Sequence, residues 1–332
     1  VIFILIDAFG WNLFQRFAGS SPLLGRIECD GVISQLTSQF PSTTTAHVTT
    51  MNSGQAVGEH GMFEWNYYEP AVDAVICPFF YSFAGDQVRH TLLAADVDPA
   101  DLFPPRTFFQ HLAQHNVASY VFPHQSYAQS PYNAVMDSSA THCYIYEELP
   151  QALELVGQAV AAESGRAYYY LHWGKVDSES HTHGPFSDDA LTAVQTTLHA
   201  IETQLIAQLS AAGRTLLLIG ADHGQDPVEP DKTIYLNHLF PDIADVFRTT
   251  ASGRPIVPGG SAKDFFLYIK ADALDDTQAL LSERLAGAAD VLRVEWLINE
   301  GYFGGRISDR FRARIGNLVI VPHAGEAVWW DE

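Results

Sequence analysis

Short apolar runs alternate with helical patterns along this chain of 332 residues, and this alternation limits the fold more than any other feature. The clearest runs of strand length are Val1–Ile6, Val117–Phe122, Ala167–Trp173, Thr215–Gly220, Phe265–Ile269 and Leu318–Val321. Runs that are apolar throughout are typical of strands buried on both faces, as in the parallel sheets of α/β proteins. We therefore predict an open, mostly parallel central sheet with helices on both faces.

The helical patterns between these runs predict where the covering helices lie. One apolar stripe recurs at spacings of three or four residues and consists of Leu191, Val194, Leu198, Ile201, Leu205 and Leu209. Such a stripe is typical of an amphipathic helix, and Gly213 is a suitable residue to end it. A second helix is predicted over 152–162.

The remaining segments predict a single α/β hydrolytic domain over residues 1–332. Residues 67–131 are rich in proline and aromatic residues and have weak periodicity, so we expect loops and short elements that form one wall of a cleft. Residues 239–260 carry three prolines and end at Gly259-Gly260, which predicts a long excursion before the sheet resumes.

The charge of the chain excludes several classes of partner. The sequence has 39 Asp and Glu against 18 Lys and Arg, for a formal net charge of −21. This excess argues against binding to nucleic acid or to an anionic membrane, because both require basic surfaces. If the protein handles phosphate, bound divalent cations must supply the positive charge, and carboxylates and its 14 histidines are suitable ligands.

The sequence predicts no membrane span, because no apolar run reaches the length of about 18 residues that a span needs. Three cysteines, Cys29, Cys77 and Cys143, lie far apart and predict no disulfide framework. With no leader segment in the chain as given, these features favour a cytoplasmic location. Nothing in the sequence indicates an oligomeric state.

Polar clusters follow several of the predicted strands. Asp7 follows the first strand, Asp177 and His181 follow the third, and Asp222 and His223 follow the fourth. Taken singly, an aspartate at a strand end is usually a turn or capping residue. Together they share the edge at which open α/β sheets bind ligands, and their charges would repel one another strongly without cations. We therefore predict two divalent metal ions at this edge.

A hydroxyl-rich turn accompanies these clusters. Residues 40–47 read Phe-Pro-Ser-Thr-Thr-Thr-Ala-His and are predicted to open a helix that runs towards Gly54. Ser and Thr before a helix usually cap it. At a helix N-terminus they also lie beside free backbone N–H groups that favour a phosphate.

These segments resemble the alkaline phosphatase superfamily, and specifically its type I phosphodiesterase/nucleotide pyrophosphatase branch. The matching residues are Ile4-Leu5-Ile6-Asp7-Ala8-Phe9-Gly10, Phe40-Pro41-Ser42-Thr43-Thr44, Glu59-His60-Gly61 with Asn66, Asp177-Ser178-Glu179-Ser180-His181 with His183-Gly184-Pro185, and Asp222-His223-Gly224. The resemblance implies an alkaline-phosphatase-like fold. It spans residues 4–224, about two thirds of the chain.

The resemblance also implies a role for each matched residue. Asp177 and His181 would bind one zinc ion, and Asp7, Asp222 and His223 would bind a second zinc ion together with the hydroxyl of Thr44. Thr44 would be the nucleophile, and Asn66 would donate a hydrogen bond to a phosphoryl oxygen. Chemistry agrees with this assignment, because coordination to a divalent cation lowers the pKa of a threonine hydroxyl that is otherwise a poor nucleophile. Manganese or another divalent metal is an alternative to zinc.

The chain departs from the family pattern in two places that bear on nucleotide specificity. Thr45 stands where nucleotide-hydrolysing members carry an aromatic residue that stacks on the base. The step from Gly61 to Asn66 is also one residue longer than usual. An aromatic cluster could stack on a base instead, although such clusters are more often cleft wall or core; it consists of Phe63, Trp65, Tyr67 and Tyr68.

A third departure concerns the last metal ligand. The family has one further histidine late in the chain, which would complete the site of Asp177 and His181. His323 is the only late histidine in this sequence, and it follows a predicted strand in a context that matches the family poorly. Two alternatives stay open: His323 is that ligand, or the ligand lies beyond the C-terminus of the chain as given.

The leading prediction is a metal-dependent hydrolase of phosphodiester or nucleotide pyrophosphate bonds that acts on a small phosphorylated substrate through a covalent phosphothreonine. A phosphomonoesterase, phosphomutase or phosphonate hydrolase of the same superfamily is the alternative within this class. A non-catalytic metal-binding interaction protein is the alternative from another class. The presence of Thr44 beside all five predicted aspartate and histidine ligands favours an enzyme.

Overall fold

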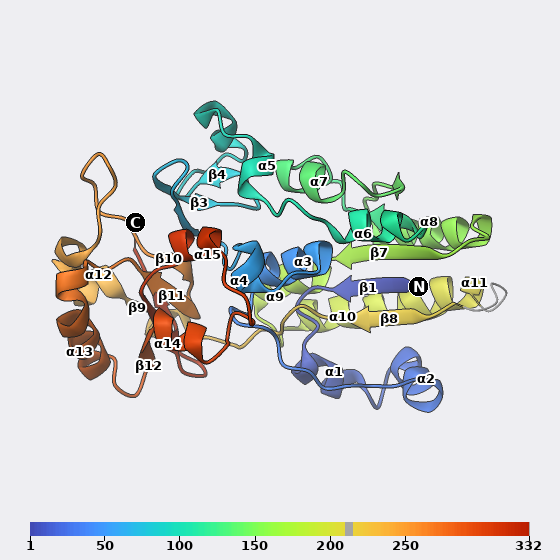
Figure 1. Cartoon of the computed structure of the whole chain (residues 1–332). Helices are drawn as coiled ribbons and strands as arrows, with labels where there is room; N and C mark the ends of the chain where they lie inside the picture. Colours follow the sequence, from blue (N-terminus) through green and yellow to red (C-terminus); the bar gives the residue numbers. More distant parts are fainter. Residues whose placement is uncertain (210–214, 332) are drawn as a thin grey trace. The chain divides into compact units, whose positions relative to one another are not determined.

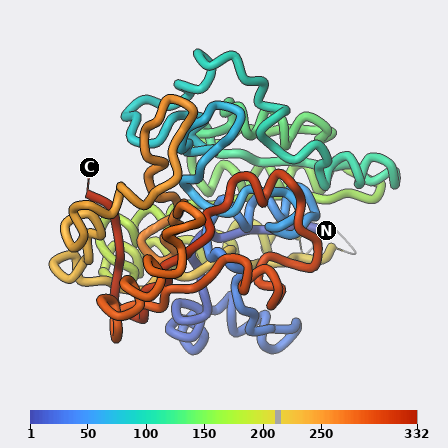
Figure 2. The backbone as a smooth tube through the Cα atoms, turned by 60° about the vertical axis from the view of Figure 1, so that its left-hand side comes forward, coloured from blue at the N-terminus to red at the C-terminus, as the bar shows by residue number. Residues whose placement is uncertain are grey.

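The computed structural model describes residues 1–209 and 215–331, and the chain divides into two compact units. Unit 1 comprises Val1–Ser38, Arg106–Gln129 and Asn133–Pro227, and unit 2 comprises Gln39–Pro105, Ser130–Tyr132 and Val228–Glu332. Figure 2 traces the backbone from blue at the N-terminus to red at the C-terminus. Each unit has its own sheet and its own core, while the single domain over residues 1–332 stays a prediction.

A five-stranded sheet forms the centre of unit 1. Its strands lie in the order β6 (His142–Cys143), β5 (Ala118–Phe122), β7 (Ala167–Trp173), β1 (Ile2–Ile6) and β8 (Leu217–Gly220). All the pairings are parallel, so the predicted parallel sheet is confirmed. β1 lies between β7 and β8, which explains why its sequence is apolar throughout (Figure 1).

Helices cover both faces of this sheet. On one face Ile2, Ile4 and Ile6 pack in a single core with side chains of α1 (Trp11–Phe17), α2 (Pro22–Asp30), α8 (Leu149–Ala162) and α10 (Asp188–Ala200). On the other face the ring of Phe108, in α6 (Phe108–Gln114), lies 5.2 Å from the ring of Tyr168 in β7. Successive strand residues point to opposite faces of a sheet. Tyr169 therefore packs in the first core, and its neighbour Tyr168 faces the helix on the other side.

The predicted helix from Leu191 to Leu209 is present but changes its hydrogen bonding partway along. α10 continues as a π-helical segment, Ile201–Ile206, and then as α11 (Ala207–Leu209). The predicted end at Gly213 lies outside the described residues. The second predicted helix is confirmed as α8, which begins at Leu149 and so three residues before the predicted start.

Two of the predicted strands belong to unit 2 and pair in an antiparallel sheet instead of the parallel one. This sheet has the order β10 (Gly259–Ser261), β11 (Asp264–Leu267), β13 (Leu318–Pro322) and β12 (Ala289–Arg293). β10 and β11 are joined by a tight turn at Ala262-Lys263, and so short a connection can join only antiparallel neighbours. The sheet packs with α13 (Leu274–Arg284) in the core of unit 2.

The proline-rich segments contain more regular structure than the sequence predicts. Residues 67–131 include an antiparallel sheet of β2 (Tyr67–Glu69), β3 (Ala74–Cys77) and β4 (Ser82–Phe83), as well as α6 and β5 of unit 1. Residues 239–260 include η4 (Ile243–Val246) and lead into β10. That residues 67–131 form a cleft wall stays a prediction.

The other elements are short. They are α3 (Thr44–Ser53), α4 (Val57–His60), η1 (Thr91–Ala95), α5 (Pro99–Leu102), α7 (Pro131–Met136), α9 (Lys175–His183), η3 (Pro230–Lys232), β9 (Ile234–Tyr235), α12 (Leu236–Leu239), η5 (Ala271–Ala273), α14 (Val294–Asn299), α15 (Asp309–Arg314) and β14 (Val328–Trp329). Within residues 1–209 and 215–331, no helix has both the length and the apolar character needed to cross a membrane.

Candidate functional site

Three neighbouring strands of unit 1 end at the predicted metal ligands (Figure 1). Asp7 directly follows β1, Asp222 and His223 come just after β8, and β7 leads through Gly174 into α9, which carries Asp177 in its first turn. The carboxyl ends of parallel strands meet at one edge, which is where open α/β sheets bind ligands. The structure therefore brings these residues to the same place in unit 1.

Three of these side chains form a compact group that could hold a cation. Asp7, Asp177 and His223 each offer one ligand atom, and these atoms all lie within 4.8 Å of one another. His223 Nε2 lies 3.5 Å from Asp7 Oδ1 and 3.5 Å from Asp222 Oδ2. We call Asp7, Asp177 and His223 the ligand group.

His181 lies beside this group without belonging to it. Its Nε2 lies 3.4 Å from Asp177 Oδ1, because residues four apart share one face of α9. The imidazole is 69% exposed, so it could turn towards a cation bound by Asp177. The predicted pair Asp177 and His181 is thus in contact, while its metal role stays a prediction.

Asp222 supplies an observation that points to a cation. Its carboxylate is buried, and Oδ1 accepts hydrogen bonds from the backbone N–H groups of Ala8 and His223, at 3.1 and 3.0 Å. Oδ2 is buried and has no hydrogen-bond donor in the part of the chain that the structure describes. A buried carboxylate oxygen without a donor is unfavourable, and a metal ion would satisfy it. The residues present therefore fit a divalent cation.

The pKa values of the cluster show that it is unfavourable to bring these charged groups together. Burial, together with the charge of Asp222, raises the pKa of Asp7 to about 6. Burial opposes the charged form of His223, but the nearby charges of Asp222, Asp7 and Asp177 outweigh it and raise the pKa of that imidazole. In the metal-free protein protons partly neutralise the site, and metal binding would displace them.

Two glycines fix the distance between the turns that carry the ligands. A Cβ atom at Gly10 would lie 2.6 Å from the Cα of Gly224, which is closer than real Cβ atoms approach. The turn after Asp7 and the turn after Asp222 therefore touch through their backbones. This contact explains the glycine at position 10, whereas a Cβ atom at Gly224 would lie 3.4 Å from the Cα of Gly10, an ordinary contact distance.

His172 is a site residue that the sequence analysis did not single out. It lies in β7, and its Nε2 donates to Asp7 Oδ2 over 3.0 Å, so it contacts a predicted ligand from outside the ligand group. The Tyr146 and Tyr127 hydroxyls donate to the His172 backbone carbonyl, at 2.5 and 3.3 Å. A histidine near the carboxyl end of an otherwise apolar strand is the signal that could have identified it.

Gln225 is the second residue of this kind. Its side-chain N–H donates to Asp177 Oδ1 over 2.7 Å. It directly follows Asp222-His223-Gly224, so one short segment provides two predicted ligands and a hydrogen bond that orients a third. Donors that orient metal-binding carboxylates are a regular feature of such sites.

The threonine turn lies in unit 2 and begins α3 as predicted. Thr43 is the N-cap residue, its Oγ1 accepts from the Ala46 N–H over 3.4 Å, and Gly54 ends the helix with φ of 69°. Thr44 is the first residue of α3 and is buried. Its hydroxyl thus lies where a helix N-terminus favours a negatively charged group.

Asn66, the other predicted catalytic residue, also lies in unit 2, just before β2, and is half-buried. Its backbone carbonyl accepts a hydrogen bond from the Gly260 N–H over 2.6 Å. A Cβ atom at Gly259 would lie 2.7 Å from the same carbonyl oxygen. The glycine pair that the sequence analysis placed at the end of an excursion therefore packs against Asn66.

Of the four aromatic residues weighed for base stacking, Phe63 and Tyr67 are in the core, and Trp65 and Tyr68 are half-buried. Thr45, Phe63 and Tyr67 are fully buried, so they cannot stack on a base. Trp65 is half-buried, and its ring contacts Phe79 and Phe80 at centroid distances of 5.7 and 5.6 Å.

His323 lies in unit 2 after β13 and is exposed. Its Nδ1 is 3.2 Å from the Gly287 carbonyl oxygen and its Nε2 is 3.5 Å from Asp290 Oδ2. These are interactions of a surface imidazole. That His323 completes the site of Asp177 and His181 stays a prediction.

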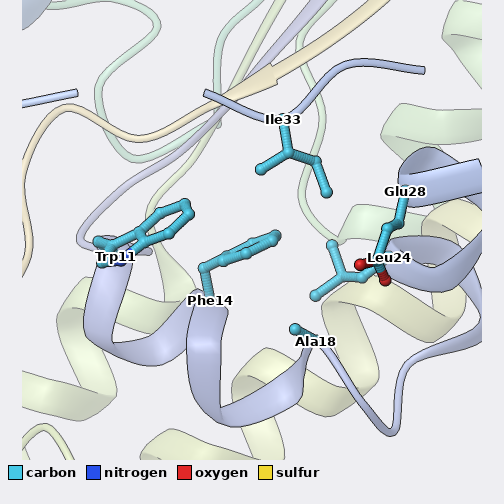
Figure 3. Close-up of a pocket in the computed structure, with 6 residues that line it drawn as sticks. All are labelled: Trp11, Phe14, Ala18, Leu24, Glu28 and Ile33. Carbon is cyan, nitrogen blue, oxygen red and sulfur yellow. The ribbon is translucent and has the colours of Figure 1, made fainter. Parts of the chain in front are cut away.

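A cavity of about 330 Å³ in unit 1 involves other residues (Figure 3). It is lined by Trp11, Phe14, Ala18, Leu24, Glu28 and Ile33. Figure 3 shows the rings of Trp11 and Phe14 rising from α1 towards Ile33. None of these residues belongs to the ligand group or to its partners described above, so the cavity is separate from the predicted chemistry.

Comparison with known proteins supports the assignment of the fold. Murine ectonucleotide pyrophosphatase/phosphodiesterase 5 is 16% identical with a TM-score of 0.75, and the match covers 100% of this chain and 81% of that one. Phosphonoacetate hydrolase from Sinorhizobium meliloti is 17% identical with a TM-score of 0.68, and the match covers 100% and 82%. At these identities the likeness shows an alkaline-phosphatase-like fold. No curated protein gives a significant match.

The family comparison covers almost the whole chain. Residues 1–329 match the family described as type I phosphodiesterase/nucleotide pyrophosphatase. This range includes both the ligand group of unit 1 and the threonine turn of unit 2. The chain belongs to the type I phosphodiesterase/nucleotide pyrophosphatase family.

Proposed function

We propose that this hydrolase cleaves phosphodiester or nucleotide pyrophosphate bonds with two zinc ions and a covalent phosphothreonine at Thr44. The observation that carries the proposal is the ligand group Asp7, Asp177 and His223, with the donor-free Asp222 Oδ2 next to it. Imidazole and carboxylate ligands at one edge of an α/β sheet suit zinc, with manganese as an alternative metal.

The proposal assigns each residue a place around the metals. Asp177 and His181 would hold one ion, and Asp7, Asp222 and His223 would hold the other together with the Thr44 hydroxyl, so the ligand group would contribute to both ions. When bound, the ions supply Lewis-acid activation of the hydroxyl and of the phosphoryl group. His172 and Gln225 orient the carboxylates of Asp7 and Asp177 through the hydrogen bonds described above.

The chain's own residues then carry the transfer. Thr44 loses its hydroxyl proton, its Oγ1 forms a bond to phosphorus, and the bond from phosphorus to the leaving oxygen breaks. The leaving oxygen takes up a proton. Asn66 donates to a non-bridging phosphoryl oxygen, and the N-terminus of α3 stabilises the charge on the phosphothreonine. Water then cleaves the phosphothreonine and restores the Thr44 hydroxyl.

Two relatives support a small phosphorylated substrate. The murine protein has also been solved as an inactive threonine-to-alanine variant in complex with AMP. The Sinorhizobium protein has been solved with phosphonoformate and with phosphonoacetate. We propose a small phosphorylated compound for this chain as well, since its net charge of −21 opposes long polyanions.

The test is hydrolysis of bis(4-nitrophenyl) phosphate and 4-nitrophenyl phosphate by the metal-free protein, with and without added zinc. We expect zinc-dependent turnover that is faster on the diester, and acid-quenched enzyme should carry phosphate on the peptide that contains Thr44. Faster turnover of the monoester would indicate a phosphomonoesterase. Rates equal to buffer on both substrates, despite bound zinc, would indicate a metal-binding interaction protein.

A further inference from the structure

Two buried carboxyl groups in unit 2, those of Glu64 and Asp264, lie in contact with each other. Glu64 is 0% exposed and Asp264, at the start of β11, is 4% exposed. Their side chains hydrogen-bond to each other. Two ionised carboxylates cannot form a hydrogen bond, because neither has a donor. The pair therefore keeps one proton.

Donors from neighbouring residues reach both carboxyl groups. Asp264 accepts from the Ser261 hydroxyl over 2.9 Å and from the backbone N–H of Ser42, and the Ser261 hydroxyl also hydrogen-bonds to Glu64. Glu64 accepts from the Trp65 N–H at Oε2, while no donor reaches its buried Oε1 among the described residues. One proton between the two carboxyl groups supplies the donor that their hydrogen bond needs.

The pKa values of both carboxyl groups agree with a shared proton, and burial raises the pKa of Asp264 above its usual value. Burial and the charge of Asp264 raise the pKa of Glu64 well above its usual value. The other groups that hydrogen-bond to the pair are the Ser42 and Trp65 amides and the Ser261 hydroxyl, and none of these titrates near neutral pH. Burial of both groups therefore favours retention of the shared proton as the pH rises.

The pair joins the two segments that carry the proposed catalytic residues of unit 2. Ser42, held by Asp264, lies two residues before Thr44, and Trp65, held by Glu64, directly precedes Asn66. A second link runs from the Thr43 hydroxyl to the Phe63 carbonyl at 3.4 Å. The turn of Thr44 and the segment of Asn66 are thus connected through buried hydrogen bonds.

The β10–β11 hairpin completes the connection. β10 supplies the Gly260 N–H that donates to the Asn66 carbonyl, and β11 supplies Asp264. Gly260 has φ of 98°, and a Cβ atom there would lie 2.1 Å from the Asp264 carbonyl oxygen. The hairpin therefore holds Asn66 and Asp264 in a fixed relation that only glycine permits.

We propose that Glu64 and Asp264, which share one proton, are positioning residues that fix Thr44 relative to Asn66 for phosphoryl transfer. This inference rests on the proposed function of Thr44 and Asn66. It adds two residues and a protonation state that the metal site does not require. Displacement of a nucleophile by about 1 Å can lower the reaction rate by about 100-fold. Loss of a rigid support for the turn should therefore lower kcat measurably.

The experiment compares Glu64→Gln with Glu64→Ala. Glutamine replaces the shared proton with an amide N–H and carries no charge, so we expect kcat within about threefold of wild type near pH 7. Alanine removes the link, so kcat should fall by about 10- to 100-fold while KM changes by less than about threefold. Glu295→Gln, on the surface of unit 2, removes one charge as a control and should leave both constants unchanged.

The pH dependence of stability gives a readout that needs neither metal nor substrate. A carboxyl group whose pKa is raised on folding stabilises the protein below its unfolded pKa of about 4.3, and this stabilisation is lost as pH rises towards the folded value. Glu64→Gln removes that dependence. We therefore compare the two metal-free proteins. The melting temperature of Glu64→Gln should rise relative to that of the wild type as the pH increases from about 5 to 9.

Several outcomes would overturn the proposal. A Glu64→Ala protein with normal kcat, or a Glu64→Gln protein as slow as the alanine variant, would show that the shared proton does not position Thr44. Parallel melting curves for wild type and Glu64→Gln across the pH range would show that no proton is held. If wild type itself hydrolyses no phosphate ester, the proposed function fails instead, and the melting curves still decide whether the pair holds a proton.

Discussion

The predicted metal ligands of unit 1 and the predicted catalytic residues of unit 2 are held by opposite physical means. The ligand group of unit 1 gathers acidic and imidazole side chains at the ends of three strands, and burial raises the pKa of Asp7 to about 6. The threonine turn of unit 2 is held by a helix cap, backbone hydrogen bonds and a carboxyl pair that shares a proton. The like charges of unit 1 repel one another unless a cation is bound, whereas hydrogen bonds hold the threonine turn of unit 2.

This contrast predicts that changes in the two units affect different measurements. Substitutions in the ligand group should alter metal affinity and the stability of the metal-free protein. Substitutions in the threonine turn should alter the rate of transfer and leave metal content unchanged. Four substitutions test the contrast, beginning with the largest expected effect.

Replacement of Thr44 by alanine removes the proposed nucleophile. We expect kcat/KM for the aryl diester to fall by more than about 1,000-fold, because no other hydroxyl takes its place in the covalent step. Zinc content should stay within about twofold of wild type, measured by mass spectrometry of the dialysed protein. Thr44→Ser is the matched control and should retain measurable turnover. Near-normal activity in the alanine variant would contradict the assignment of the nucleophile.

Asp7→Asn sharpens the contrast by separating metal affinity from stability. The rise in the pKa of Asp7 from 3.8 to about 6 corresponds to about 3 kcal/mol that opposes folding of the ionised form. A carboxyl group with a raised pKa loses its stabilising effect as the pH rises. The metal-free Asp7→Asn protein should therefore become more stable than the metal-free wild type between about pH 4 and pH 6, and it should remain more stable above pH 6.

Added zinc should reverse this order, because wild type binds the ion and Asp7→Asn binds it weakly. Activity of the variant at limiting zinc should fall by about 100-fold or more. Melting temperatures with zinc and with a chelator provide the measurement. An Asp7→Asn protein that binds zinc as tightly as wild type would remove Asp7 from the ligand group.

His172 tests whether orientation of a ligand matters as much as its presence. His172→Phe removes the donor to Asp7 Oδ2 and should weaken zinc binding by about 10- to 100-fold, measured by competition with a fluorescent chelator. His172→Gln keeps a side-chain N–H and should recover most of that loss. Equal affinities for the phenylalanine and glutamine variants would show that only the size of the side chain matters.

Thr43→Ala has the smallest expected effect and tests unit 2 alone. Loss of the cap on Ala46 N–H should cost about 1 kcal/mol of stability, measured by chemical denaturation, and Thr43→Ser should restore it. Zinc affinity should be unchanged in both variants. A large loss of zinc affinity in Thr43→Ala would break the separation between the two units.

Sequence reasoning located the ligand-bearing edge because that edge depends on local signals. An apolar run such as Val1–Ile6 indicates a buried strand, and Asp7 directly after it must lie at the carboxyl end of that strand. The structure shows β1 flanked by β7 and β8, so the residues that follow all three strands lie together. Capping by Thr43 and termination at Gly54 were likewise readable from short-range patterns.

The features that sequence reasoning missed depend on pairings between distant segments. Nothing local to β11 or β13 indicates that they form an antiparallel sheet apart from β1. Glu64 and Asp264 each look like ordinary acidic residues until the fold buries them against each other. His172 became notable only when register placed β7 beside β1 and its ring beside Asp7.

The contact between Gly10 and Gly224 has a consequence for how the site acquires its metal. Because the two turns meet through their backbones, Asp7, Asp222 and His223 are held near one another before any ion arrives. Binding then requires little ordering of the chain, so most of the conformational entropy has been lost on folding. We expect zinc to bind this preformed site of unit 1 with fast, single-step kinetics and with a small change in amide hydrogen exchange.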